Sequence, residues 1–424
     1  MSDDAVRFHR RTARELTARY DLVENPPERW REIAAWHWAQ AGAFAEAADD
    51  AIKVAEGWIG RLDFAAARRW AELTLEYLER LTLIERQAYE LRAYAVALAV
   101  LEFGGQYREG LDYAGRMLRA ARAHGSRATQ AQALLAQGRM QRELNQLAPA
   151  EATLQAALTL AESEEEGALE ADVRFHLAKV HQLQGRHIEA LQQLQLAHEE
   201  HALADDQMKI ARVFTGMGDI YRVLGAAREA FGFYTRALLL EQGRGSVLGQ
   251  AILREKMALA LLAQEKLAEA ESSERESMRL RGLIGDVVGQ ARSYSVLGKI
   301  AQQFGHYEQA LELHEQARTL EEQTQNQRGQ HVALLHLGDA YLALGRYEQA
   351  ESSYRQAHEL ATVRNDRVAL VRTLERQGDM WAAQARRDTA NSAWVEALRM
   401  REALGHADEA VALRERLKTG ARAR

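Results

Sequence analysis

The sequence predicts an all-α fold made of repeated helix pairs, and three observations carry that prediction. Alanine, leucine, glutamate, arginine and glutamine dominate, while only 3 of the 424 residues are proline, a composition that favours helices. Residues 334–357 carry two apolar stripes at helical spacing, separated by Gly345. The same pattern returns every 40 residues, and a fixed period of this length is typical of stacked repeats.

The stretch 334–357 predicts one helix–turn–helix unit. Its first helix presents Leu334, Leu337 and Tyr341, and its second presents Tyr347, Ala350, Tyr354 and Ala357. Gly345 between them supplies a backbone that tolerates a tight helix end. Gly338 lies inside the first helix, where glycine costs about 1 kcal/mol relative to alanine. We therefore expect close packing of the second helix at that position.

The period of 40 fixes the register of eight units. A small residue is expected in the first helix of each, at Leu98, Gly138, Ala178, Gly218, Ala258, Gly298, Gly338 and Gly378. Two units depart from the pattern. Leu98 is large, so we expect the first pair to splay. Glu274 and Ser277 stand where other units have an aromatic residue and alanine, so we expect the fifth pair to pack least well.

Residues 86–404 resemble the tetratricopeptide-repeat (TPR) family in its 40-residue variety. The resemblance implies a right-handed α-solenoid, or superhelix, of antiparallel helix pairs. It also implies that the first helices line a concave groove that binds a protein, a peptide or a small regulator without chemistry. We expect three segments: an irregular helical region at 1–85, eight repeats at 86–404, and a capping helix and tail at 405–424.

Residues 7–80 carry a second resemblance. The string FHRRTARELTARY and the following alanine- and tryptophan-rich helices resemble the helical stretch after the nucleotide-switch modules of STAND signal-transduction ATPases. In those proteins a TPR array is the sensor arm. This resemblance implies an alternative function, the inducer-sensing domain of such an ATPase or of a transcriptional regulator.

Composition and motifs argue against several classes. The net charge of −6 argues against nucleic acid as the partner. The chain has no cysteine, and no run of 18 apolar residues suggests a membrane span, so we expect a cytoplasmic protein. His198 and His201 are one residue short of the zinc-hydrolase spacing, and Gly298-Lys299 lacks the rest of a phosphate-binding loop. We expect no catalytic residue, cofactor or metal.

The groove is the predicted binding site. By family register, its charged residues are Arg139, Arg142, Lys179, Arg212, Asp219, Arg222, Arg292, Lys299, Asp339, Arg372 and Asp379. The N-terminal half is basic and the C-terminal half turns acidic, which predicts an acidic or bipolar partner segment at the basic end. The alternative is that these charges only solubilise the groove. A tryptophan-rich N-terminal region could also provide an apolar edge for homo-oligomerisation.

Overall fold

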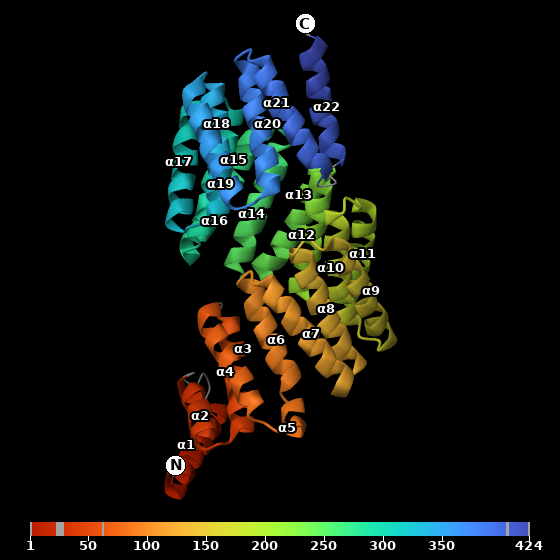
Figure 1. The fold of residues 1–424 in the computed structure, drawn as a ribbon, viewed down its shortest axis with the longest axis vertical. Coiled ribbons are helices and arrows are strands. Elements are labelled where there is room, and N and C mark those ends of the chain that lie inside the picture. Colours follow the sequence, from red (N-terminus) through yellow and green to blue (C-terminus); the bar gives the residue numbers. More distant parts are fainter. Residues whose placement is uncertain (1, 23–28, 62, 404–406, 423–424) are drawn as a thin grey trace. The chain divides into compact units, whose positions relative to one another are not determined.

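The computed structural model describes residues 2–22, 29–61, 63–403 and 407–422, and every regular element in these ranges is a helix (Figure 1). The all-α, TPR-like solenoid prediction is therefore confirmed. The chain divides into two compact units, Met1–Val213 and Phe214–Arg424. The sequence-based segments 1–85, 86–404 and 405–424 divide the chain by repeat register, and they remain a prediction.

Unit 1 begins with an irregular region and continues with regular pairs. Its helices are α1 (Asp3–Leu22), α2 (Arg29–Gln40), α3 (Phe44–Gly60), α4 (Phe64–Glu79), α5 (Leu83–Gln87), α6 (Glu90–Phe103), α7 (Tyr107–His124), α8 (Arg127–Glu143), α9 (Leu147–Ser163), α10 (Gly167–Leu183), α11 (His187–Leu203) and the first part of α12 (Gln207–Val223).

Unit 2 contains the rest of α12 and regular pairs up to a terminal helix. Its helices are α13 (Ala227–Gly243), α14 (Val247–Leu262), α15 (Leu267–Ile284), α16 (Val287–Gln303), α17 (Tyr307–Gln323), α18 (Gln327–Ala343), α19 (Tyr347–Val363), α20 (Arg367–Ala383), α21 (Arg387–Ala403) and α22 (Ala407–Arg422).

The turn inside each pair depends on one residue with a left-handed backbone. Gly345 has φ +69°, which an L side chain adopts only with strain, and it ends α18 as the sequence predicted. Asn145, Glu265 and Ala385 hold the same place in other units with positive φ. The geometry is therefore a property of the turn, and glycine makes it easiest to reach.

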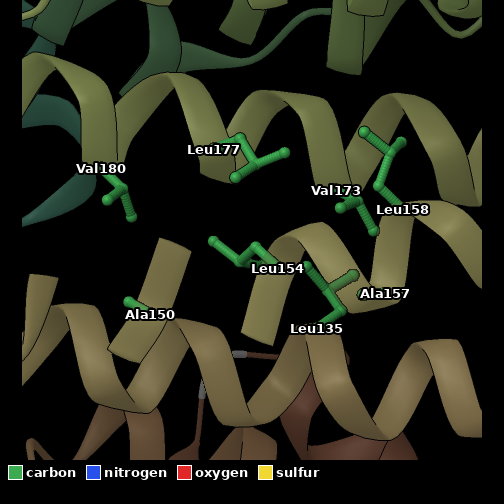
Figure 2. Close-up of a cluster of buried hydrophobic side chains, with 8 residues drawn as sticks. All are labelled: Leu135, Ala150, Leu154, Ala157, Leu158, Val173, Leu177 and Val180. Atoms are coloured by element: carbon green, nitrogen blue, oxygen red, sulfur yellow. The ribbon is translucent and has the colours of Figure 1, made fainter. Parts of the chain in front are cut away.

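In the core of each repeat, the second helix of a pair packs between its own first helix and the first helix of the next pair. Figure 2 shows Leu154 and Leu158 of α9 packed between Leu135 of α8 and Leu177 of α10. Leu154 has no exposed surface and Leu177 has 1%. Because each stripe is buried only by the adjacent helices, a single pair could not bury its own core.

The expected close packing lies between position n of a first helix and position n+16 of the second helix; we call these two residues a slot pair. A Cβ atom at Gly338 would lie 2.4 Å from Cε1 of Tyr354, and one at Gly138 would lie 2.6 Å from Cγ of Leu154. The same holds at Gly218, Gly298 and Gly378, which meet Tyr234, His314 and Trp394. The glycines are therefore required by packing.

In the first repeat the large residue of the slot pair lies on the first helix and the small residue lies on the second. Leu98 is large, but its partner 16 residues later is Ala114, and both lie in one buried cluster with exposures of 5% and 0%. The total side-chain volume of the slot pair is thus preserved. Both side chains are thus buried, and the expected splaying of this helix pair stays a prediction.

The expectation that the fifth helix pair, α14 and α15, packs least well is wrong. Glu274 and Ser277 of α15 have no exposed surface, so the pair is closely packed and differs only in its chemistry. The Ser277 hydroxyl donates a hydrogen bond to the carbonyl of Ala251 at 2.8 Å. Arg281, also fully buried, donates to Ser293 Oγ at 3.2 Å and forms an ion pair with Glu255.

Glu274 is the costly member of this polar cluster. Among the described residues, neither of its carboxyl oxygens has a hydrogen bond of ordinary geometry. Burial is the main cause that raises the pKa of Glu274, to about 8, while the proximity of Ser293 and the charge of Arg281 oppose the rise. The side chain is therefore protonated at neutral pH in the folded protein.

This predicts a loss of stability with rising pH that glutamine should remove. Below pH 4.5 the Glu274 carboxyl is neutral in both the folded and the unfolded protein. Between pH 4.5 and about pH 8 it ionises only in the unfolded protein. Over that range the free energy of unfolding therefore falls by about 1.4 kcal/mol per pH unit. Glu274→Gln should gain stability over the wild type from pH 5 to pH 8, as measured by urea unfolding. Glu269→Gln, at an exposed position of the same helix, is the control. An equal pH response of Glu274→Gln and the wild type would contradict the assignment.

Candidate ligand-binding surface

All the predicted groove residues lie on first helices of the pairs. Within unit 1, Arg139 and Arg142 lie on α8, Lys179 on α10 and Arg212 on the first part of α12. Within unit 2, the residues are Asp219 and Arg222 on α12, Arg292 and Lys299 on α16, Asp339 on α18, and Arg372 and Asp379 on α20.

Unit 1 brings its four cations together around His176, and we call Arg139, Arg142, Lys179 and Arg212 the His176 cation cluster. Arg142 Nη1 donates to His176 Nδ1 at 2.8 Å. His176 is only 8% exposed. Burial, followed by the charges of all four cluster members, holds the pKa of His176 well below its usual value. His176 is therefore neutral and accepts the arginine hydrogen bond.

The aromatic ring of Phe175 packs against two of the cations. The guanidinium carbon of Arg212 lies 4.7 Å from the centroid of Phe175, and Lys179 Nζ lies 5.7 Å from it. These are cation–π distances. Burial lowers the pKa of Arg212, and the charges of Arg139 and Arg142 act in the same direction. Helices α8, α10 and α12 thus hold like charges close together, and a bound anion would reduce the repulsion between them.

Two carboxylates on the protein already neutralise part of this charge. Arg139 Nε donates to Glu102 of α6 at 3.1 Å, and Arg142 Nε donates to Glu143 at 3.1 Å. The side chains of Arg139 and Glu102 retain 33% and 24% of their exposure. An acidic ligand would therefore reach the cluster from solvent and compete with these carboxylates.

The acidic candidates of unit 2 are engaged in packing between repeats. Asp339 accepts a hydrogen bond from the Tyr354 hydroxyl at 2.7 Å and pairs with Arg376 at 3.5 Å. Asp219 accepts from Tyr234 at 2.9 Å and from Lys256 at 2.6 Å. Asp379 pairs with Arg416 at 2.8 Å. In each case the cation stands 37 residues later, on the next first helix or on α22, so these aspartates join neighbouring elements.

The remaining cations of unit 2 have mixed surroundings. Burial lowers the pKa of Lys299; Asp339 and Glu255 oppose that shift, while Arg376 and Arg372 add to it. The positive charge of Arg292 lowers the pKa of the buried Glu274 and of Glu321, in each case against a larger effect of burial.

Arg222 belongs to unit 2 and lies on α12. Burial raises the pKa of Tyr234, and Arg222 opposes that rise through its charge and a hydrogen bond. Its environment is therefore a packing site inside its own repeat.

Glu102, Phe175 and His176 are not among the residues that the sequence predicted for the site, although His176 lies at the centre of the cluster. The signal was present, because Phe175-His176 lies two to three residues before the small position Ala178, almost one helical turn before Lys179. His181, by contrast, lies 3.4 Å from Glu151. The two histidines thus have different partners.

In the described ranges, no group of three or more histidine, aspartate or glutamate side chains is arranged to hold a metal ion. No helix within those ranges is long and apolar enough to cross a bilayer.

Residues 331–362 match the family model described as Tetratricopeptide repeat. The fold is of the TPR type. No curated protein matches the chain. Solved structures share the fold at low identity. The apo form of the quorum sensor NprR from B. thuringiensis is 16% identical with a TM-score of 0.60, over 84% of this chain and 97% of that one.

Two other similar structures have related architectures. A Rap protein complexed with competence and sporulation factor is 15% identical with a TM-score of 0.54, over 80% of this chain and 98% of that one. A STAND protein with a tetratricopeptide repeat sensor, from Pyrococcus horikoshii, is 14% identical with a TM-score of 0.52; the match covers 80% of this chain and 53% of that one.

Proposed function

We propose that the protein is a non-catalytic, cytoplasmic scaffold, a sensor or adaptor that binds a partner protein or peptide, with an acidic segment of the partner at the His176 cation cluster. The single observation that carries this proposal is the gathering of four cations from three helices around a buried neutral histidine. A purely solubilising role would not need a buried imidazole to orient Arg142. The Arg139 side chain is 33% exposed and that of Arg142 is 14% exposed, so solvent reaches both.

Solved structures of the same fold support a sensor function. Proteins with the same fold include a quorum sensor and a Rap protein that holds competence and sporulation factor. By analogy the ligand here could be a peptide or a small inducer. The acidic residues of unit 2 do not enter the proposal, because Asp219, Asp339 and Asp379 already have partners within the array.

The proposal predicts charge-selective binding that depends on α8. Fluorescent decapeptides of equal length, one acidic, one neutral and one basic, would be titrated at low and physiological salt by fluorescence polarisation. The acidic peptide should bind best, and Arg139→Glu with Arg142→Glu should weaken it at least tenfold. Glu102→Gln should tighten binding severalfold, because it removes the carboxylate that competes for Arg139.

A matched control separates local recognition from net charge. Arg116→Glu with Arg119→Glu makes the same charge change at exposed positions of α7, and it should leave the affinity within twofold. Equal loss in both double variants would reduce the effect to non-specific electrostatics. Unchanged affinity in the α8 variant would reject the proposed site.

A second candidate is the inducer-sensing arm of a STAND-type ATPase or transcriptional regulator. The similarity to the P. horikoshii protein with a TPR sensor favours it, since this chain matches 53% of that longer chain. An immunoblot of the native host, with an antibody against this chain, decides between the two. The sensor-arm function predicts a band well above 47.7 kDa; a band at that mass would support a free-standing scaffold.

Homo-oligomerisation is a further component that the N-terminal region could provide. Trp36 and Ile33 of α2 are 51% and 42% exposed, and Phe8 of α1 is 61% exposed. Such apolar exposure is compatible with a contact between copies. The mass in solution, measured by light scattering, tests this component directly.

A further inference from the structure

The N-terminal helices hold a pair of histidines that the proposed ligand surface does not use. Helices α1 and α2 pack side by side at the N-terminal end of unit 1 (Figure 1). The Nδ1 atoms of His9 on α1 and His37 on α2 lie 2.7 Å apart. Their ring centroids are 4.9 Å apart with an interplanar angle of 42°. Two imidazole nitrogens therefore converge on one point from separate helices.

Aromatic rings enclose the pair without sealing it. Trp36 lies edge-on to His37 at 4.8 Å and to His9 at 5.4 Å, and Phe8 lies edge-on to His9 at 5.5 Å. Trp36 and Phe8 are themselves more than half exposed, so solvent can reach the site.

The nitrogen–nitrogen distance is informative about which ion could fit. With metal–nitrogen bonds of about 2.0 Å, two ligands at a right angle lie about 2.8 Å apart, whereas two tetrahedral ligands lie about 3.3 Å apart. The present 2.7 Å is the distance of a nitrogen–nitrogen hydrogen bond, so the right-angled arrangement of square-planar or tetragonal sites could form with the smallest movement of the two rings. That geometry is preferred by Cu²⁺ and Ni²⁺, and imidazole is a ligand that suits both.

We propose that His9 and His37 form a two-histidine site for a tetragonal divalent transition metal ion, with Cu²⁺ as the best fit. Water would complete the coordination, because no third histidine or carboxylate joins the pair among the described residues. A bound ion would replace the present nitrogen–nitrogen hydrogen bond and tie α1 to α2. The alternative is that the pair is only an N–H···N hydrogen bond between two helices.

The test uses the full chain and Cu²⁺ as the probe. Electron paramagnetic resonance with pulsed echo modulation counts the imidazoles bound to the ion. We expect one Cu²⁺ per chain with two equatorial imidazoles. His9→Gln and His37→Gln should each leave one imidazole and weaken binding at least tenfold. His306→Gln, which removes an exposed histidine of unit 2, should change neither measure.

Two results would overturn the proposal. One is a wild-type Cu²⁺ spectrum without paired imidazoles, which needs no variant and so does not depend on how the variants fold. The other is unchanged affinity in His9→Gln and His37→Gln, with helix content verified by circular dichroism. Either result would leave the pair as a hydrogen bond between α1 and α2.

Discussion

The fit between a residue of the first helix and the residue 16 positions later in the second helix is the constraint on which the repeats depend. The two side chains share one volume, so a glycine accepts tyrosine, histidine, tryptophan or leucine, and a leucine accepts alanine. This fit sets how closely the two helices approach. Because a solenoid is stabilised by contacts between neighbours, the approach within each pair also determines which side chains meet the next pair.

The charges follow from that arrangement. Tyr354 fills the slot beside Gly338, and its hydroxyl then reaches Asp339, which in turn pairs with Arg376 of the next first helix. The aspartates on this face are thus occupied by the array. In unit 1, Leu154 fills the equivalent slot and offers no hydroxyl. Arg139 takes the place of the aspartate and pairs with Glu102 of the preceding first helix.

Much of the fold could be predicted from the sequence, because its signals are local and periodic. Gly345 gave the turn, and the period of 40 placed the charged positions on the first helices. Four predicted residues of unit 1 do gather in one cluster. The sequence also shows why Gly338 must be small, although it does not say which side chain fills the space.

The remaining features depend on which pairs of residues meet in the folded chain, and a single sequence position does not reveal its partner. Leu98 looked like a defect because Ala114, its compensating partner, stands in another helix. Glu274 suggested loose packing, but a protonated carboxyl can be buried where a leucine would fit. His9 and His37 are 28 residues apart and on different helices, so no sequence spacing brings them together.

The most direct test of the shared-volume account is a double-mutant cycle that converts the slot pair Gly338/Tyr354 into the type seen at Leu98/Ala114. Gly338→Leu and Tyr354→Ala would be made singly and together, and the free energy of unfolding measured in urea. The account predicts that the combined loss is smaller than the sum of the single losses by at least about 2 kcal/mol, well above the coupling expected of independent sites. Losses that add within about 0.5 kcal/mol would show that the two residues do not share one volume, and would contradict the account.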